Sequence, residues 1–154
     1  MGMPGTVMLG LANPWNRVMN NLLVVQSPDL PAPAGHYSHA IAHGDTLYIS
    51  GQLGRGPGLS DEEAGDISVQ TRRALSKIEA IARAAGSGLS NLIKVNVYIS
   101  DVAHWPAVNA EYARILGQHR PARAIVPVSA LHYGALVEID AIAALPARVL
   151  APQL

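Results

Sequence analysis

An arginine at the start of an apolar run is the first residue in this sequence whose position suggests chemistry. Arg123 lies in residues 121–126 (PARAIV), where a loop leads into a predicted strand. A guanidinium group in apolar surroundings loses hydration energy unless it meets an anion, and its planar fork of donors suits a carboxylate. Two interpretations follow: Arg123 binds a carboxylate, or it pairs with an acidic residue of its own chain or extends into solvent.

Two acidic residues, Glu138 and Asp140, occupy alternate positions of another predicted strand. Side chains two residues apart lie on the same face of a strand. Carboxyl groups this close raise the pKa of one of them, as in an acid/base pair. The same spacing also fits a solvated acidic stripe, or a structural ion pair between Arg123 and either acid.

Three histidines, His36, His39 and His43, resemble a metal-binding pattern. We expect His39 and His43 to share one face of a strand, with His36 on the other face. The only acidic residue close by is Asp45. Because a third ligand at a suitable distance is missing, we expect no metal site and interpret these residues as polar loop and strand positions.

Composition excludes several classes of function. There is no cysteine, and therefore no thiolate nucleophile, disulfide or thiolate metal site. Eleven basic residues balance eleven acidic ones, which argues against a dedicated nucleic-acid binder. No nucleophile elbow, phosphate-binding P-loop or zinc-protease motif is present. With 154 residues, 49% of them hydrophobic, the chain predicts a single domain, and its zero net charge favours self-association.

The elements that position these residues follow from periodicity. We expect helices from Asp66 to Ala85 and, after a cap at 100–101, over the stripe 105–116. A loop is predicted at 54–63, and Pro127 favours an edge strand or a bulge. The strands are expected at 46–50, 93–99, 124–129 and 135–143, with a further short one at 22–25. This order predicts an α+β domain in which two helices cover one face of a mixed sheet, leaving the other face for a partner.

Four segments, taken in order, resemble the Rid family, the YjgF-like reactive intermediate deaminases. They are 33–40 (PAGHYSHA), 47–52 (LYISGQ), 120–123 (RPAR) and 134–143 (GALVEIDAIA). The resemblance runs from about Pro28 to Ala144. It divides the chain into an N-terminal extension, 1–27, and a single Rid-like domain, 28–154. It implies a chorismate-mutase-like fold and a homotrimer with ligand clefts between subunits.

The resemblance also implies an activity of the 2-iminobutanoate/2-iminopropanoate deaminase type. Such enzymes hydrolyse reactive enamine or imine acids, such as 2-aminoacrylate, to 2-oxo acids and ammonia without a cofactor or metal. Arg123 would bind the substrate carboxylate, and Glu138 would position or activate the attacking water. The residues that match binding positions of the family are Tyr37, Ser50, Gly51, Asn109, Arg123 and Ile125, and Asp140 would lie beside Glu138.

The sequence departs from the family near the expected cleft. His36, Ala124 and Ile125 replace residues that are common there, as do His132 and Tyr133, so positions 124 and 125 can offer a substrate only backbone contacts. A bulkier or more apolar imino acid would fit these changes. The alternative function is a non-catalytic trimer that binds small carboxylates as a sensor or modulator. RNA cleavage, an older label of the family, is disfavoured by the balanced charge. We expect a cytoplasmic protein without membrane or nucleic-acid partners.

Overall fold

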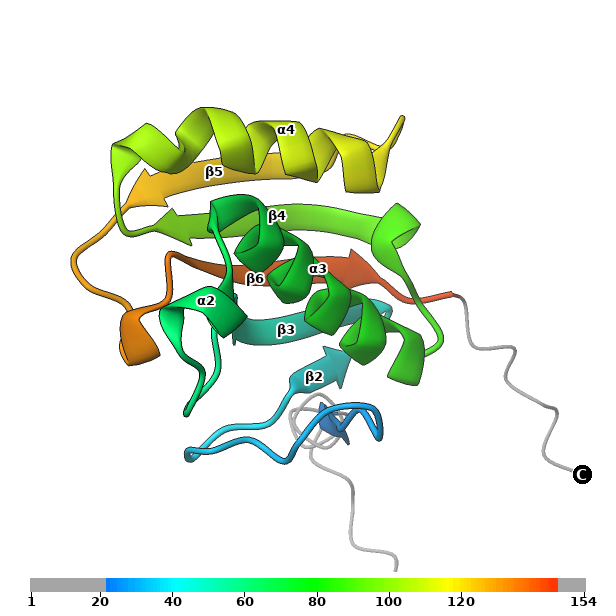
Figure 1. The fold of residues 1–154 in the computed structure, drawn as a ribbon. Coiled ribbons are helices and arrows are strands. Elements are labelled where there is room, and N and C mark those ends of the chain that lie inside the picture. The colour runs from blue at the N-terminus through cyan, green and yellow to red at the C-terminus, as the bar shows by residue number, and fades with distance from the viewer. Residues whose placement is uncertain (1–21, 147–154) are drawn as a thin grey trace, which may run out of the picture.

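A mixed six-stranded sheet forms the centre of the fold (Figure 1). The structure, a computed structural model, describes residues 22–146, so residues 1–21 of the expected N-terminal extension lie outside it. The strand order is β1-β2-β3-β6-β4-β5, and β4 and β5 form the parallel pair while the other neighbours are antiparallel. The strands are β1 (Leu22–Val25), β2 (Ala40–His43), β3 (Thr46–Leu53), β4 (Leu92–Ile99), β5 (Ala122–Pro127) and β6 (Val137–Ala144).

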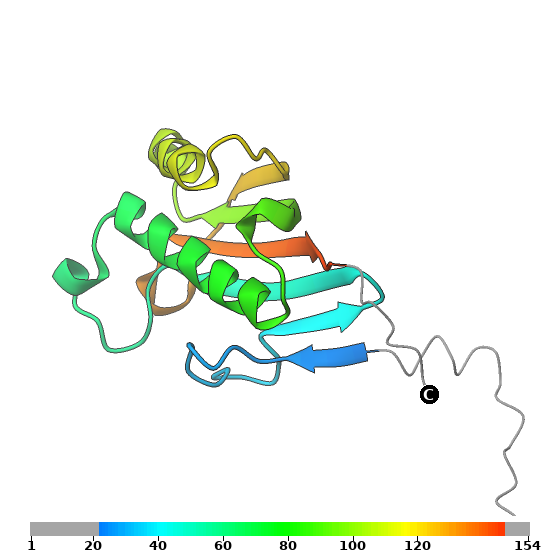
Figure 2. The ribbon, with the colours of Figure 1, turned by 90° about the vertical axis from the view of Figure 1, so that its right-hand side faces the viewer.

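Two long helices, α3 (Ile67–Ala84) and α4 (Trp105–Leu116), cover one face of this sheet (Figure 2). The predicted α+β arrangement with two helices on one face is therefore confirmed for the long helices. A short helix, α2 (Asp61–Ala64), lies where a loop was expected. It forms because Ser60 and Glu63 make a reciprocal capping box, in which each side chain bonds the other residue's backbone N–H.

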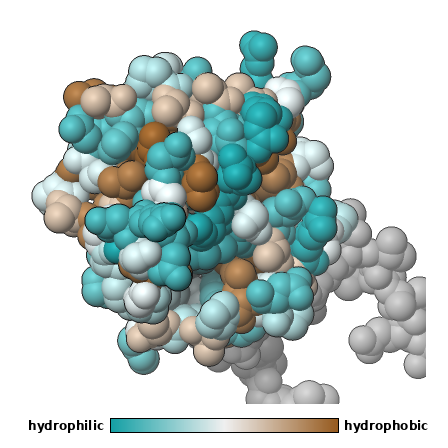
Figure 3. Space-filling model, in the orientation of Figure 1, coloured by the Kyte–Doolittle hydropathy of each residue, from teal (hydrophilic) through white to brown (hydrophobic). Residues whose placement is uncertain are grey.

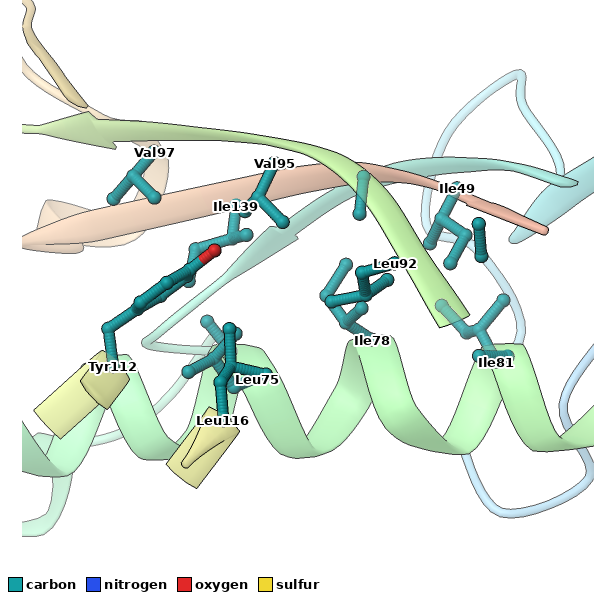
Figure 4. Packing of buried hydrophobic residues seen from close by; sticks show 14 of the residues in the cluster. Ile49, Leu75, Ile78, Ile81, Leu92, Val95, Val97, Tyr112, Leu116 and Ile139 are labelled. Carbon is teal, nitrogen blue, oxygen red and sulfur yellow. The ribbon is translucent and has the colours of Figure 1, made fainter. Parts of the chain in front are cut away.

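Apolar side chains from the helices and from one face of the sheet form the core (Figure 4). Along β6, and along β4 from Val95 onward, every second residue is buried, so each strand presents one apolar face to α3 and α4. Burying one such Val, Leu or Ile side chain contributes roughly 1.5–3 kcal/mol. Gly86 ends α3 with a φ of 77°, a conformation in which glycine avoids a side-chain clash.

The strand boundaries differ most from the sequence prediction in β3, β5 and β6. β3 continues through Gly51 to Leu53, because an irregularity between Ile49 and Gln52 lets it stay paired with β6. β5 begins earlier than expected, at Ala122, so that Arg123 lies inside the strand and not in the loop before it. β5 lies at the edge of the sheet, which confirms the edge position that Pro127 indicated. Finally, β6 begins at Val137 and leaves residues 135–136 outside.

The start of α4 also differs from the prediction. Asp101 caps a single turn of 3-10 helix, Val102–His104, by accepting a hydrogen bond from the backbone N–H of Ala103 at 2.8 Å. The α-helix itself begins at Trp105, with Pro106 in its first turn, where its missing N–H has no intrahelical partner to lose.

The opposite face of the sheet, called here the open face, is not covered by a helix in the described part of the chain (Figure 2). Val24, Tyr48 and Val126 are exposed on it. The helix-covered side, by contrast, is mostly hydrophilic at its centre, with separate apolar patches (Figure 3). An oligomer that buries the open face stays a prediction. Within residues 22–146, no helix combines the length and the hydropathy needed to cross a bilayer.

A buried carboxylate links the two long helices, and we expect it to make stability depend on acid pH. Glu111 on α4 binds Arg114 of its own helix at 2.5 Å and Arg72 of α3 at 2.9 Å. The hydrogen bond from Arg114 and then that from Arg72, against the effect of burial, lower the pKa of Glu111 to about 2. A lowered pKa means that the stabilisation is complete above the ordinary value of 4.5 and is lost as the pH falls towards 2.

The Glu111→Gln variant should therefore unfold at a lower denaturant concentration than the natural protein at pH 7, with the difference closing as the pH approaches 2. Chemical denaturation across this pH range measures it. A difference that stays constant with pH would contradict this role of Glu111.

Candidate functional site

The side chain of Arg123 lies against α4, on the helix-covered face of the sheet. Arg123 is paired with the buried Val95 across β4 and β5, which places both on that face. Its Nη2 donates a hydrogen bond to the Asn109 Oδ1 at 3.0 Å. The guanidinium also lies 4.6 Å from the centre of the Tyr112 ring and 5.9 Å from that of Trp105. Such cation–π contacts stabilise a cation by about 0.5–2 kcal/mol.

These three partners come from one side of α4, because positions 105, 109 and 112 are separated by about one helical turn each. The helix thus fixes the plane of the guanidinium while using few of its donors. In residues 22–146 the ion pairs of arginine involve Arg55, Arg72, Arg83 and Arg114. The ion pair between Arg123 and Glu138 or Asp140 that the sequence left open is therefore not formed within the chain.

A cavity of about 450 Å³ lies beside Arg123. Asn109, Tyr112, His119 and Arg120 also line it. The guanidinium has five N–H donors, and Asn109 is the partner seen among the described residues. The free donors, supported by the positive charge of Arg120, suit a small carboxylate.

The hydroxyl of Tyr112 is buried and has no hydrogen-bond partner among the described residues. An unpartnered buried hydroxyl costs about 1–3 kcal/mol, and burial raises the pKa of Tyr112 to about 12. The Tyr112→Phe variant keeps the ring under Arg123 and removes the hydroxyl, so we expect it to raise the free energy of unfolding by about 1 kcal/mol. Thermal and urea denaturation test this, and a lower stability would reveal a partner for the hydroxyl.

On the open face, Asp140 is fixed by two side chains of the neighbouring strand β4. It accepts hydrogen bonds at 2.8 Å from the Asn96 Nδ2 and at 2.8 Å from the Tyr98 hydroxyl. Sequence reasoning did not single out Asn96 and Tyr98. The alternation of apolar and polar residues in 93–99 could have indicated them. Once β4 pairs antiparallel with β6, the polar residues of β4 face the same way as Glu138 and Asp140.

Glu138 lies on the same face, half-buried, and pairs across the sheet with Tyr98. Burial raises the pKa of Glu138, and the neighbouring Asp140 raises it further. The effect of Asp140 on Glu138 that the sequence predicted is therefore present, but burial is the larger cause of the raised pKa of Glu138. A carboxyl group in this state accepts a proton more readily than an exposed one, as a general base requires.

Gly51 is the residue against which the Glu138 carboxyl group packs. A β-carbon built on Gly51 would overlap the Glu138 Oε1, so no larger residue fits while Glu138 keeps its position. The resemblance suggested that the backbone at this glycine lies close to a ligand. The structure shows that the group closest to its missing side chain is the candidate catalytic acid itself.

The Gly51→Ala variant should displace the Glu138 carboxyl group while leaving the sheet intact, because the overlapping atom is the end of a flexible side chain. We expect a fall in kcat of about tenfold or more with little change in stability. Turnover assays and thermal denaturation measure the two quantities. Unchanged kcat would show that the position of this carboxyl group does not matter for turnover.

The remaining predicted site residues are distributed around these two centres. Tyr37 is half-exposed and lines a cavity together with Gly51. The Ser50 hydroxyl donates a hydrogen bond to the Ser38 carbonyl oxygen at 2.6 Å, so it connects β3 to the segment that precedes β2. Ile125 lies half-buried on the same face as Arg123.

The two centres do not meet within one chain. Arg123 and Asn109 lie on the helix-covered side of the sheet, whereas Glu138 and Asp140 lie on the open face. Alternation along the strands fixes these orientations, because a side chain cannot change face without a one-residue shift in register. One small molecule therefore cannot contact Arg123 and Glu138 of the same subunit at once.

The histidines have separate positions and roles. His39 is buried before β2, where its Nδ1 accepts a hydrogen bond from the Ser27 N–H at 3.0 Å. Its Nε2 therefore carries the proton and donates to the Pro31 carbonyl oxygen at 3.0 Å. His43 is exposed at the end of β2, whereas His39 precedes the first residue of that strand. The expectation that these two histidines share one strand face is therefore wrong. Residues 22–146 contain no group of three potential ligands close enough to hold a metal ion.

Comparison with known proteins adds independent information. The model of a family described as Endoribonuclease L-PSP matches residues 27–145. A RutC family protein of Pyrococcus horikoshii is 42% identical over 120 residues, covering 78% of this chain and 95% of its own. A 2-iminobutanoate/2-iminopropanoate deaminase of Capra hircus is 38% identical over 78% of this chain and 88% of its own. The crystal structure of RidA from an Antarctic Psychrobacter is 36% identical, with a TM-score of 0.73 over 80% of this chain and 99% of its own.

Proposed function

This chain belongs to the Endoribonuclease L-PSP family, also called the YjgF/RutC/Rid family, and from that premise we propose that it hydrolyses reactive imino acids to 2-oxo acids and ammonia. Relatives at 37–38% identity are named 2-iminobutanoate/2-iminopropanoate deaminase, which supports this class of reaction. The chain supplies two groups that the reaction could use, a preorganised arginine for a carboxylate and a half-buried carboxyl group for a water molecule.

The placement of Arg123 and Glu138 on opposite faces of the sheet carries the proposal that the active site lies between subunits. A substrate can use both residues only if they come from different copies of the chain. Arg123 lies on the edge strand β5, where a neighbour can approach, and Glu138 lies on the open face, which a neighbour can cover. A homotrimer, as the family resemblance implies, would bring these surfaces together.

The proposed chemistry follows from these groups. Arg123 binds the substrate carboxylate and so places the imine carbon at a fixed distance from Glu138. Glu138 takes a proton from water as the water oxygen bonds to the imine carbon, and returns this proton to the imine nitrogen, giving a tetrahedral carbinolamine. Glu138 then carries the proton of the new hydroxyl to the nitrogen, the C–N bond breaks as the C–O double bond forms, and ammonia leaves. The sum is one imine and one water converted to one 2-oxo acid and one ammonia.

A second candidate is a trimer that binds small carboxylates without turnover. It is favoured by Ala124 and Ile125, whose side chains can supply no polar contact beside Arg123. Cleavage of RNA, which the family's description suggests, is disfavoured because the chain has no net positive charge to attract a polyanion.

A coupled assay tests the proposal. A pyridoxal-phosphate lyase generates 2-aminoacrylate in situ, and pyruvate formation is followed with and without the protein. We expect faster pyruvate formation with the protein present. Saturable binding of 2-oxo acids by calorimetry, with no acceleration for any imine tested, would instead establish the carboxylate-binding alternative.

A further inference from the structure

A second cavity, of about 150 Å³, adjoins the acid centre at the end of β3. Its walls come from the segment before β2, from the loop after β3 and from the turn His132–Gly134, and they include Leu30, Pro31, Pro33, Tyr37, Leu53 and Tyr133. Gly51 lines this cavity and also lines the hollow that contains Glu138 and Asp140. The cavity and this hollow therefore share Gly51, against which the Glu138 carboxyl group packs.

The two basic side chains at this cavity are already engaged by the protein. The Lys77 Nζ donates to the Leu53 carbonyl oxygen at 2.8 Å. Arg55 binds the Asp61 carboxylate at 2.7 Å and the Leu59 carbonyl oxygen at 2.6 Å. Burial, together with the nearby Arg73, lowers the pKa of Lys77. Most of the remaining wall is aliphatic or aromatic, so the cavity is suited to an apolar group.

Tyr133 forms part of the wall in an uncommon backbone conformation. Its φ is 58°, the left-handed region that a bulky residue seldom adopts. Its ring lies 3.7 Å, centre to centre, from that of His132. This turn conformation places the Tyr133 ring at the same cavity that Tyr37 lines. The two rings can flank a flat apolar substituent.

We propose that this cavity is the subsite for the substrate's side chain, and that the protein acts on imino acids whose side chain is apolar and about the size of a benzene ring. A cavity of about 150 Å³ is the size that holds one benzene molecule. With the imine carbon at Glu138, the substituent on that carbon points past Gly51 into the cavity. This inference rests on the proposed function, because it assigns a substrate class to the same site.

The test first compares imino acids that differ in their side chains, and then narrows the cavity by a substitution. An amino-acid oxidase generates imino acids in situ from phenylalanine, leucine, alanine and glutamate, and their loss is followed with and without the protein. We expect kcat/KM for the phenyl-bearing imine to exceed that for 2-iminopropanoate about tenfold or more, and the acidic imine to be poor. Ala34 also lines the cavity. The Ala34→Trp variant therefore places a large side chain there and should abolish the preference while sparing 2-iminopropanoate.

The Ala110→Trp variant, on the exposed surface of α4, is the matched control and should keep the preference. Circular dichroism and thermal unfolding establish that both variants fold. Equal rates for large and small imines, or an equal loss of both in Ala34→Trp, would overturn the subsite. If no imine is hydrolysed, the proposed function fails, and calorimetry with phenylpyruvate and pyruvate then decides the subsite alone, since equal affinities would refute it.

Discussion

The Arg123→Lys variant is expected to lose about 100-fold in kcat/KM on any imino acid that the natural protein hydrolyses. Lysine keeps the positive charge but lacks the planar fork that holds a carboxylate at two points. A charge-assisted hydrogen bond contributes about 1.5–3 kcal/mol, and about 1.4 kcal/mol corresponds to a factor of ten in rate. The larger change to alanine should cost more, because the charge is lost as well.

The contacts of Arg123 explain why lysine cannot replace it. The guanidinium is held by the Asn109 Oδ1 at 3.0 Å and lies over the rings of Tyr112 and Trp105. A flexible ammonium group would make neither contact in the same geometry. The loss should therefore appear in kcat as well as in KM, because the substrate would be bound with a less defined orientation.

Arg83→Lys provides the control for the arginine series. Arg83 is exposed at the end of α3 and pairs with Glu79 of the same helix. The same chemical change at that position should leave kcat/KM unaltered. Turnover of Arg123→Lys and Arg123→Ala at the natural rate would show that the carboxylate binds elsewhere and would end the proposed mechanism.

The second large effect on the rate is expected when Glu138 or Asp140, the two acidic residues of β6, is replaced. Glu138→Gln should lower kcat by about 100- to 10,000-fold, the range typical of removing a general base. In the natural protein, the rate should rise with pH as Glu138 loses its proton, since only the ionised form accepts a proton from water. Burial and Asp140 raise the pKa of Glu138, so this rise should occur at a higher pH than for an ordinary carboxyl group.

The Asp140→Asn variant separates the effect of Asp140 on the pKa of Glu138 from the effect of burial. It removes the negative charge that disfavours ionisation of Glu138, so the pKa of Glu138 should fall and the rising part of the pH–rate profile should move to lower pH. Asparagine can still accept the hydrogen bond from Tyr98 or Asn96 through its carbonyl oxygen. Glu62→Gln, a neutralisation on the exposed helix α2, should leave the profile in place.

The pH–rate profiles of the natural protein, Asp140→Asn and Glu62→Gln, together with the rate of Glu138→Gln, decide the matter. If Asp140→Asn shifts the rising limb to higher pH, or leaves it unchanged, then Asp140 does not control the ionisation of Glu138. If Glu138→Gln retains the natural rate, another group activates the water.

Much of the fold could be predicted from local pattern. The period-2 alternation of 93–99 and the helical stripe from Ile67 each describe one apolar face, and burial of that face places the element against the core. Gly86 and Gly117 mark helix ends because both adopt a positive φ. Helix α2 was missed, since a four-residue helix is defined by a capping box and has no periodicity to detect.

The candidate site could be predicted only in part. Arg123, Glu138 and Asp140 were identifiable because charged residues in apolar strands are costly and require partners. The partners themselves were not, since Asn96 and Tyr98 reach Asp140 only through the pairing of β4 with β6, 44 and 42 residues apart. Likewise, the buried position of His39 depends on the backbone groups of Ser27 and Pro31, which no local periodicity indicates.

The sequence by itself determined which residues are chemically unusual, which elements carry them and which face of each strand is apolar, because these properties depend on residue type and local periodicity. Only the tertiary structure decided where the faces point relative to one another. Strand order and register place Arg123 beneath α4 and Glu138 on the open face, and thereby separate the two groups that one substrate contacts in the proposed mechanism. Long-range pairing sets that relation, and no local pattern encodes it.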